Sequence, residues 1–492
     1  MSHGLWWDVL QVVLLTMVII GAIPVVVGLY QFALVPFHVW RNHNKHAAPY
    51  FPRVAVIVPA WNEGAVVGTS IDRLVRLEYP ADRLRVYVVD DASTDDTPDV
   101  VRERGRRYPG RVVHLRREKG GEGKAHTLNH GIRILLDEGW AQAVLIMDAD
   151  VIYQPDSLRK MTRHLADPEV GAVTAFIAEG SPRPAYLTRY VGYEYVAAQA
   201  AARRAQNVLG VLACLAGGAQ LHSRENLEAI GGRIDTTTLA EDTVSTFLTQ
   251  LGGRKVVFEP YAVVLAEEPE AVGALWKQRL RWARGNVQVT RRFRHLWFRP
   301  WKHRLLGGFS FGLIWFSVFL LPLCMLLSSV GLIGLWLIDS GLAARLFAVI
   351  WLLAAGTYLF ITAMTLQIDP RSGRRTWREA VAFPGLISLL VMLTAFVPNL
   401  MTDLLPDIGE TIFVLFTYAW LTLCMPAAWL AKWAENVRVG RLEVGRWLAP
   451  TLVYLIGYGP LLCAITFDAY VKEFKGAANV WDKTEKTGRV MS

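Results

Sequence analysis

The distribution of apolar residues constrains this chain most, because it forms two blocks of membrane-length windows with a more polar stretch between them. The windows are residues 9–40, 305–338, 346–368, 380–402, 411–431 and 447–467. None contains Asp, Glu, Lys or Arg, and each reaches the ~20 residues that a helix needs to cross a bilayer core. The first window lacks a preceding basic region and a clear cleavage site, so we expect a retained anchor. The sequence therefore predicts one soluble domain inserted between transmembrane helices.

The formal net charge is +9, and the basic residues are concentrated beside the second apolar block. Residues 271–338 contain no Asp or Glu, and ten Lys or Arg lie between Lys277 and Arg304. Two interpretations stay open: a basic collar at the membrane surface, or a cluster that partly neutralises a diphosphate. The cluster adjoins a membrane segment, which argues against nucleic acid as a partner. Basic loops stay on the cytoplasmic side, so we expect a multi-pass protein of the cell membrane whose soluble domain is cytoplasmic.

Strand-like and helix-like patterns alternate from Arg53 to about Glu270. We expect strands at residues 53–59, 84–89, 112–115, 143–147 and 172–177, and helices at 64–77, 95–105, 124–138 and 185–206. We place Ser93 or Thr94 near the N-cap of the second helix. This spacing is typical of an α/β fold with a mostly parallel, doubly wound sheet. Residues 271–304 have an amphipathic helical pattern that suits a membrane interface.

Two acidic pairs lie where the predicted strands end. Asp90-Asp91 follows the second strand, where it either caps the next helix or contacts a nucleotide. The segment Pro59-Ala60-Trp61-Asn62-Glu63 ends the first strand and would line the same pocket. Asp148-Ala149-Asp150 follows a strand that is apolar on both faces. Its two carboxylates would repel each other unless a divalent metal joins them to a substrate diphosphate.

Three further motifs have both a chemical and a structural interpretation. Glu241-Asp242 precedes a helical pattern, so it either stabilises the helix N-terminus or supplies a general base. Gln278-Arg279-Leu280-Arg281-Trp282 forms either an interfacial belt or a clamp for a diphosphate and a sugar ring. The Gly-rich segment from Lys119 to Lys124 is either a turn or a phosphate contact. Gly217-Gly218 lacks side chains, so a substrate can approach the backbone there.

In this order, over about residues 50–300, the motifs resemble glycosyltransferase family 2, and within it the membrane-integrated processive polysaccharide synthases. The sequence GALWKQRLRWARG, with Glu241-Asp242 upstream, is similar to bacterial poly-β-1,6-N-acetylglucosamine synthases; hyaluronan, chitin and cellulose synthases share the motif set. The resemblance implies a GT-A fold, a UDP-sugar donor, Mg²⁺ or Mn²⁺, and inversion at the anomeric carbon. It also implies one protein that polymerises the sugar and secretes the polysaccharide, and an accessory secretion subunit is a candidate partner.

The resemblance also implies a role for each site residue. Asp242 would be the catalytic base, with Glu241 beside it. The nucleotide-sugar would contact Pro59, Asn62, Glu63, Asp91, Lys124, Asp148, Gln278 and Arg281. Asp150 and Asp148 would hold the metal, and Trp282, Gly217 and Gly218 would bind the acceptor. Ala240 is a departure, because many relatives have Thr before Glu-Asp.

The implied organisation has five parts: an anchor at residues 1–48, a GT-A domain at 49–270, interface helices at 271–304, a transmembrane region at 305–470 and a tail at 471–492. The tail sequence at residues 481–486 resembles a gating segment that covers the nucleotide site from the cytoplasm. Counting every window as a span puts the tail outside, so residues 380–402, with two prolines, are our candidate for a re-entrant segment. Two other functions stay open: a nucleotide-binding transporter, and a non-processive enzyme that glycosylates a lipid carrier.

Overall fold

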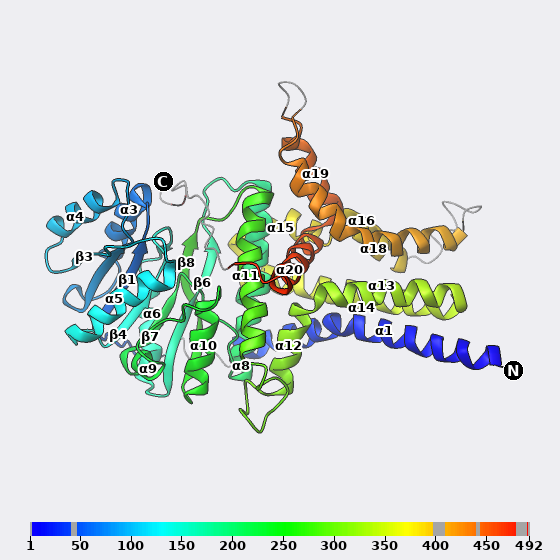
Figure 1. The fold of residues 1–492 in the computed structure, drawn as a ribbon, viewed down its shortest axis with the longest axis horizontal. Coiled ribbons are helices and arrows are strands. Elements are labelled where there is room, and N and C mark those ends of the chain that lie inside the picture. The colour runs from blue at the N-terminus through cyan, green and yellow to red at the C-terminus, as the bar shows by residue number, and fades with distance from the viewer. Residues whose placement is uncertain (1, 41–46, 397–408, 439–442, 479–489, 491–492) are drawn as a thin grey trace. The chain divides into compact units, whose positions relative to one another are not determined.

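The computed structural model describes residues 2–40, 47–396, 409–438, 443–478 and 490, which form two compact units (Figure 1). The sheet unit comprises Ala33–Pro269, Gly285–Phe311 and Ala478–Ser492. The helical unit comprises Met1–Phe32, Glu270–Arg284 and Gly312–Ala477. The boundary divides one long helix after Arg284, so the Gln-Arg-Leu-Arg-Trp sequence belongs to the helical unit.

The sheet unit is built around one eight-stranded sheet with the order β3-β2-β1-β4-β7-β6-β8-β5. Its strands are β1 (Val54–Ala60), β2 (Leu84–Asp90), β3 (Val112–Arg116), β4 (Ala143–Ile146), β5 (Ile152–Tyr153), β6 (Val170–Glu179), β7 (Gln220–Ser223) and β8 (Lys255–Ala266). The first four strands in this order are parallel, as expected. β7 runs antiparallel to β4 and β6, so the rest of the sheet is mixed. β7 begins with Gln220 beside Ile146, at the carboxyl end of β4, and therefore runs in the direction opposite to β4.

Helices cover both faces of the parallel strands. They are α3 (Gly64–Leu74), α4 (Thr97–Arg107), α5 (Lys124–Glu138), α6 (Ser157–Thr162), α9 (Arg224–Ala229) and α10 (Glu241–Leu251), with α2 (Val35–Trp40) nearer the N-terminus. Val56 and Val58 of β1 share a core with Ile71 of α3. Ile57 points the opposite way and shares a second core with Leu128 of α5. Both faces of β1 are therefore buried, which explains its continuous apolar sequence and confirms the expected α/β class.

The loops after β1 and β2 are joined by polar side chains. Ser93 Oγ accepts a hydrogen bond from the backbone N–H of Asn62 (3.0 Å), and Asn62 Oδ1 accepts one from the N–H of Thr94 (2.9 Å). α4 begins only at Thr97 and has no side-chain cap. The cap prediction for Ser93 or Thr94 is therefore wrong, because these residues connect the two loops instead.

One expected helix is continuous but partly π-helical, and another is shorter than expected. Residues 185–206 form α7 (Tyr186–Glu194), a π-helical turn (Tyr195–Ala201) and α8 (Ala202–Leu209). Residues 271–304 form α11 (Val272–Arg292) and then a series of turns. α11 ends where the chain turns inward to bury Phe293 and Trp297, so only part of the predicted interface segment is helical.

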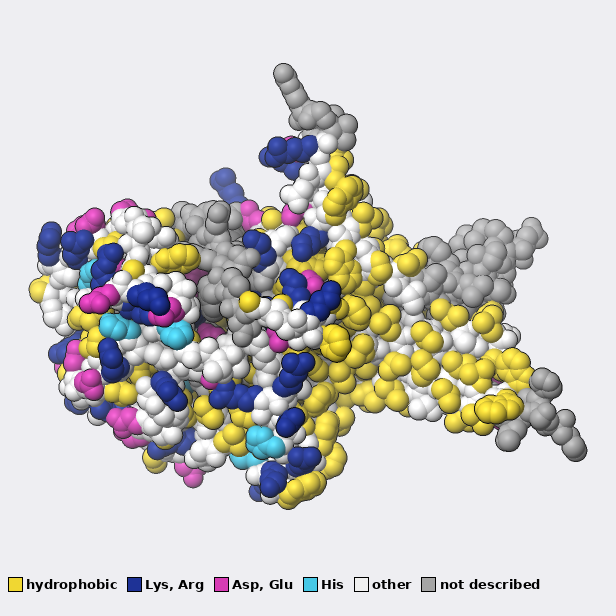
Figure 2. All heavy atoms as spheres, in the orientation of Figure 1, with side chains coloured by type: hydrophobic (Ala, Val, Ile, Leu, Met, Phe, Trp, Pro, Cys, Tyr) yellow, Lys and Arg dark blue, Asp and Glu magenta, His cyan; other side chains and the backbone are white. Residues whose placement is uncertain are grey.

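The helices of the helical unit, apart from the first part of α11, are mostly apolar, and hydrophobic side chains dominate that part of the surface in Figure 2. They are α1 (Ser2–Ala33), α12 (Phe309–Phe319), α13 (Leu321–Ile338), α14 (Ser340–Ile368), α15 (Pro370–Ala382), α16 (Leu386–Phe396), α18 (Gly409–Ala434), α19 (Gly445–Ile456) and α20 (Tyr458–Phe474). Among the described helices, Trp6–Trp40, Leu321–Ile338 and Ser340–Ile368 are long and apolar enough to cross a membrane. The window 305–338 thus contains one such helix, because the chain breaks near Leu320 between α12 and α13.

Two further helix pairs are sharply bent, and their breaks meet. Gly373–Ala382 and Leu386–Leu393 differ by 71°, and Gly445–Ile456 and Tyr458–Phe474 by 96°. Gly385 (φ +89°) and Gly457 (φ +94°) lie at the breaks. A Cβ on Gly457 would lie 2.6 Å from the backbone N of Gly385, so the crossing requires glycine. The bend in the first pair fits a broken span or a re-entrant segment; residues 397–402 of that predicted window and the tail at 481–486 lie outside the described residues.

Candidate active site

Asp90 fixes the carboxyl end of β2. It is fully buried and accepts hydrogen bonds from Arg116 Nη1 (3.0 Å) and from the backbone N–H of Ser93 (2.8 Å). Burial would raise its pKa, but hydrogen bonds from His114 and Ser93 and the charge of Arg116 outweigh burial, and the pKa is lowered. Asp90 is therefore structural, which leaves Asp91 as the candidate nucleotide contact.

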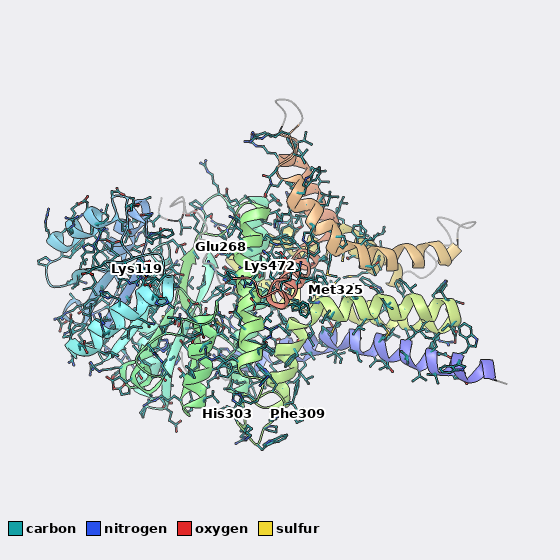
Figure 3. The ribbon with its side chains drawn as sticks, viewed as in Figure 1. Lys119, Glu268, His303, Phe309, Met325 and Lys472 are labelled. Atoms are coloured by element: carbon teal, nitrogen blue, oxygen red, sulfur yellow. The ribbon has the colours of Figure 1, made fainter. Side chains whose placement is uncertain are left out.

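Asp91 is also buried and holds the Gly-rich loop against the strand end. It pairs with Arg117 and accepts a hydrogen bond from the backbone N–H of Gly121 (2.9 Å). Arg117 also pairs with Glu122 of the same loop. A Cβ on Gly120 would lie 2.0 Å from the carbonyl oxygen of Asp91, so only glycine allows this approach. The loop therefore packs against the strand end that carries Asp91, and its contact with a phosphate stays a prediction. Lys119, at its start, is labelled in Figure 3.

Pro59, Asn62 and Glu63 lie at the neighbouring strand end. Pro59 pairs with Val89 in the β1–β2 register. Asn62 has a left-handed backbone (φ +52°), and the N–H of Glu63 donates to Thr97 Oγ1 (2.8 Å). The sheet thus brings the predicted nucleotide residues of both loops to one edge, as expected for carboxyl ends of parallel strands.

Lys124, the first residue of α5, is the central cation of the site. Its buried ammonium pairs with Asp148 and lies 4.0 Å from Glu241 Oε1. It also donates to the carbonyl oxygen of Gly217 (3.1 Å). Burial alone would lower the pKa of Lys124, but the carboxylates of Asp148, Glu241 and Asp242 outweigh burial and raise it. One positive charge therefore connects Asp148 with the adjacent pair Glu241-Asp242, which lies far from it in the sequence.

Asp242 lies in the first turn of α10, partly accessible and otherwise enclosed by protein. Burial raises the pKa of its carboxyl, and the N–H of Thr243 and the charge of Lys124 only partly offset burial. Cys214 and Arg203 also interact electrostatically with Asp242, and the Cys214 thiol donates a hydrogen bond to the carbonyl oxygen of Leu215 (2.8 Å). A carboxylate with a raised pKa is suited to accept a proton from a hydroxyl group.

Gly217 and Gly218 lie between the side chains of Asp148 and Asp242. A Cβ on Gly217 would lie 3.3 Å from Asp242 Oδ2, and one on Gly218 would lie 3.3 Å from Asp148 Oδ2. Tyr153 holds this turn by donating to the carbonyl oxygen of Gly218 (3.1 Å). The two glycines thus keep the space beside both carboxylates open, which agrees with the predicted approach of a substrate to the backbone.

The second part of α11 supports the loop before α10. Gln288 Oε1 accepts a hydrogen bond from the backbone N–H of Leu239 (2.9 Å). Gly285 packs against Ala240, because a Cβ on Gly285 would lie 2.7 Å from the Ala240 Cβ. Ala240, the departure noted in the sequence, therefore lies at a close helix–loop contact next to the acidic pair.

The Gln-Arg-Leu-Arg-Trp residues belong to the helical unit. Gln278 and Arg279 are buried, and the Arg279 guanidinium lies 4.0 Å from the centre of the Trp282 ring. Arg279 Nη1 donates to Gln278 Oε1 (3.0 Å). The indole of Trp282 is about one-third exposed. The roles of Gln278, Arg281 and Trp282 toward a substrate stay predictions.

Asp148 and Asp150 both follow β4, and Asp148 is about one-third exposed. Among the residues that the structure describes, no group of three or more His, Cys, Asp or Glu could hold a metal. A metal here would therefore need oxygen ligands from a substrate or from water. This is the usual situation of Mg²⁺, which binds one or two carboxylates together with phosphate oxygens.

Sequence reasoning missed the residues that surround the predicted ones. Arg117 and Tyr153 carry no motif, and their roles depend on contacts with distant loops. Cys214 belongs to no motif either, and its place near Asp242 depends on tertiary packing. Arg203 could have been found, because it lies in an Ala-rich helix that offers no other reason for a buried charge.

Comparison with known proteins identifies the family of this domain. Residues 52–285 match the model of the family described as glycosyltransferase like family 2. This domain belongs to glycosyltransferase family 2. The match spans the sheet, all three acidic motifs and the first part of α11, and it confirms the glycosyltransferase expected from the motifs, with its GT-A class of α/β fold.

Several curated glycosyltransferases are similar to this chain. The probable glycosyltransferase YdaM of Bacillus subtilis is 29% identical over 333 residues, which cover 67% of this chain and 77% of YdaM. The beta-monoglucosyldiacylglycerol synthase of Synechocystis sp. is 33% identical over 245 residues, 50% of each chain. The poly-beta-1,6-N-acetyl-D-glucosamine synthase of Staphylococcus epidermidis is 28% identical over 244 residues, 49% of this chain and 56% of that enzyme. The chain thus spans only about half of the latter two relatives.

Among solved structures, a mannosyltransferase from Pyrobaculum calidifontis in complex with GDP-Man and Mn²⁺ is similar, with a TM-score of 0.49 and 25% identity. The aligned part covers 77% of this chain and 99% of that one. The fold assignment of the glycosyltransferase domain rests on its own sheet and on the family match.

Proposed function

We propose that this chain is a membrane-embedded, inverting glycosyltransferase that polymerises a UDP-activated sugar into a β-linked polysaccharide and secretes it. The observation that carries the proposal is the arrangement of Asp242, Lys124 and Asp148 around the side-chain-free turn Gly217-Gly218. This arrangement offers a base, a phosphate-side cation and space for an acceptor within one site.

In the proposed reaction, the Asp242 carboxylate takes the proton from the acceptor hydroxyl group. The acceptor oxygen then forms a bond to the anomeric carbon of the donor sugar, while the bond from that carbon to the diphosphate oxygen breaks. UDP leaves with the electron pair of the broken bond. Lys124 lies between the two acidic motifs, so its charge can stabilise the negative charge that grows on the leaving diphosphate.

The carboxylates of Asp148 and Asp150 suit a divalent cation such as Mg²⁺ or Mn²⁺. The carboxylate of Asp148 pairs with the ammonium of Lys124, which directs it toward the turn Gly217-Gly218. When bound, the metal would neutralise charge on the diphosphate. The remaining ligands would come from the nucleotide-sugar and from water.

The donor and the product are inferred from the relatives. The similarity to a poly-N-acetylglucosamine synthase favours UDP-N-acetylglucosamine as donor and a growing polysaccharide as acceptor. The apolar helices of the helical unit support insertion in the cell membrane, with the glycosyltransferase domain in the cytoplasm by the positive-inside rule. An accessory secretion subunit is a further possible partner.

A second function is favoured by one comparison. The beta-monoglucosyldiacylglycerol synthase has a higher identity to this chain, 33%, than the polysaccharide synthase has. The same site could then transfer a single sugar to a lipid. The base and the donor site would be unchanged, and only the acceptor would differ.

One experiment separates these functions. The purified protein is reconstituted in lipid nanodiscs, each UDP-sugar is added in turn, and the release of UDP is measured. A radiolabelled product that remains in the aqueous phase and migrates as a ladder indicates polymerisation. A labelled product that extracts into organic solvent indicates lipid glycosylation. Absence of UDP release with every donor, and with diacylglycerol supplied, would refute both.

A further inference from the structure

The chain after α11 forms an exposed surface that the proposed reaction does not use. We call it the basic tip; it consists of residues 299–309, and its exposed side chains are Arg299, Trp301, Lys302, Arg304, Leu305 and Phe309. Trp301 is 73% exposed and Phe309 is 61% exposed. Figure 3 labels His303 and Phe309 on this segment, and Figure 2 shows Lys and Arg side chains beside hydrophobic ones there.

The basic tip is built on a buried aromatic cluster. The Trp297 ring stacks on Phe311, with ring centres 6.1 Å apart and planes 22° apart. Phe247 of α10 contacts Phe293 (4.9 Å), Trp297 (6.0 Å) and Phe311 (5.9 Å) between ring centres. Aromatic pairs of this kind add stability beyond area burial. The segment is therefore fixed to α10, the helix that begins with Glu241-Asp242.

Polar contacts fix the tip further, and the residue just before it has a strained backbone. His303 Nε2 lies 3.1 Å from the carbonyl oxygen of Gln250 in α10, and His303 Nδ1 accepts a hydrogen bond from the N–H of Leu306 (3.0 Å). Phe298 has a left-handed backbone (φ +56°), which is rare for a bulky residue and is tolerated only where the surroundings enforce it. Such strain is often retained at functional sites.

The exposed cations and apolar side chains of the tip together indicate which partner it binds. Residues 271–338 contain no acidic residue, so nothing in this part of the sequence neutralises Arg299, Lys302 and Arg304. Exposed cations alternating with an exposed Trp and Phe match a membrane surface with anionic headgroups above acyl chains. A free nucleotide would match the cations and could stack its base on one ring, but it would leave the other apolar side chains uncovered.

The covalent structure places a membrane within reach of the tip. The helix Phe309–Phe319 follows directly, and the candidate span Leu321–Ile338 comes next. The first of these helices has 11 residues and is about 16 Å long. If Leu321–Ile338 crosses a bilayer, the tip cannot be far from the headgroups of that bilayer.

We propose that the basic tip binds the anionic headgroups of the surrounding membrane, and that this contact stabilises α10 and the active site at its N-terminus. Binding of the tip depends only on the surface described above. The effect on catalysis rests on the proposed function, because it assumes that Asp242 acts as the base.

The binding is tested by hydrogen–deuterium exchange of the full-length protein in nanodiscs. The nanodiscs contain phosphatidylcholine alone or phosphatidylcholine with phosphatidylglycerol. We expect peptides from residues 294–309 to exchange more slowly in the anionic nanodiscs. Each cation near an anionic surface strengthens binding by about fivefold. The triple variant Arg299→Gln, Lys302→Gln, Arg304→Gln should therefore lose the protection.

A matched control removes the same charge elsewhere. Arg102, Arg106 and Arg107 of α4 are exposed, and their triple change to Gln should leave the protection of the tip intact. Trp301→Ala should reduce the protection without changing the charge. UDP release is measured in parallel; anionic lipid should increase it for the wild type and for the α4 variant, but not for the tip variant.

The outcomes separate the two proposals. Equal exchange of the tip in both kinds of nanodisc would overturn the lipid contact, whatever the enzyme activity. Protection by added UDP, without an effect of lipid, would overturn it too and assign the tip to the nucleotide. Protection by anionic lipid with no change in UDP release would retain the binding surface and reject its coupling to the active site. If no UDP is released under any condition, the exchange data still test the contact, and only the proposed function fails.

Discussion

Arg284 and Glu473 form a buried ion pair in the helical unit, in which Arg284 Nε donates to Glu473 Oε1 over 2.6 Å. Arg284 Nη2 also donates to the carbonyl oxygen of Ala477 (2.6 Å). Trp276, eight residues earlier in α11, donates from Nε1 to Asp468 Oδ2 (2.9 Å). Asp468 and Glu473 both belong to α20, so two contacts fix the helix of the Gln-Arg-Leu-Arg-Trp sequence to the end of the membrane region.

The spacing of residues along α11 places its contacts with α20 on one face of the helix. Trp276, Leu280 and Arg284 are four residues apart, so they share one helical face. At 100° per residue, Gln278 and Trp282 lie on the other side of the helix. The N-terminus of α11 is capped by Glu435, whose carboxylate accepts from the N–H of Val272 (2.7 Å) and of Gly273 (2.8 Å). One face of α11 thus makes the anchoring contacts, and Gln278 and Trp282 lie on the opposite face.

The first prediction concerns this anchoring. Glu473→Gln removes a counter-charge of the buried Arg284 guanidinium, and removal of one partner of a buried pair costs about 3–5 kcal/mol. We expect a clear fall in the unfolding temperature in detergent and a loss of UDP release. The double variant Arg284→Glu, Glu473→Arg should recover part of both.

The matched control is Glu443→Gln. It removes the partner of Arg446 in an exposed pair, which contributes less than about 1 kcal/mol. If Glu473→Gln behaves like Glu443→Gln, the buried pair does not hold α11.

The second prediction separates the catalytic from the structural effect of Asp242. Asp242→Asn should reduce turnover by about 10²-fold or more, because general-base catalysis typically contributes at least that. UDP binding should stay close to that of the wild type. The unfolding temperature at neutral pH should rise, because burial raises the pKa of Asp242 and the ionised carboxylate therefore opposes folding.

The pH dependence of stability follows from the raised pKa of Asp242. With a folded-state pKa above the unfolded value of about 3.9, the contribution of Asp242 to stability is complete below the unfolded pKa and is lost as pH rises through the folded pKa. Turnover shows the opposite trend, because only the ionised form is a base; it should fall as pH decreases through the raised pKa. Asp99→Asn, at an exposed position of α4, should change neither property. An Asp242→Asn enzyme that keeps a tenth of the wild-type turnover would assign the base elsewhere.

The third prediction concerns the metal. Asp150→Asn should abolish UDP release while the protein stays folded, because one of two carboxylates that suit a divalent cation is removed. Excess EDTA should have the same effect on the wild type, and added Mg²⁺ or Mn²⁺ should restore activity only to the wild type. Asp156→Asn, at a half-buried position that pairs with Lys160, is the control. Full turnover of the wild type in EDTA would exclude a metal requirement.

The sequence predicts the acidic site better than its surroundings. Asp91 and Asp148 follow parallel strands whose carboxyl ends necessarily lie together, and the predicted helix 124–138 has the observed bounds. β7 was not expected, because four residues that include Gln220 and His222 have no alternating apolar pattern. The central position of Lys124 was not expected either, since its contacts come from three distant segments.

The membrane region shows a similar limit. Windows of apolar residues predict where membrane helices occur, but hydropathy does not register a bend. The breaks at Gly385 and Gly457 depend on each other, because each backbone occupies the space where the other would have a side chain. Such paired breaks follow from tertiary packing and not from either sequence alone.

The last prediction concerns Trp282. The Arg279 guanidinium lies 4.0 Å from the centre of its ring, so one face of the indole already has a cation–π partner. Only the other face can stack on an acceptor sugar. Trp282→Phe keeps a flat apolar ring and should keep most of the polymer synthesis, whereas Trp282→Ala should lose it.

The comparison must exclude a purely structural role. Loss of the ring also removes the contact with Arg279, so both variants are checked for membrane insertion and unfolding temperature. Trp377→Ala, an exposed aromatic residue in α15, is a control for general effects of removing an indole from the helical unit. A selective fall in product length for Trp282→Ala, with UDP affinity unchanged, is the result expected for an acceptor contact. Equal synthesis by the Ala and Phe variants would return Trp282 to an interfacial role and would leave the acceptor site to be found elsewhere.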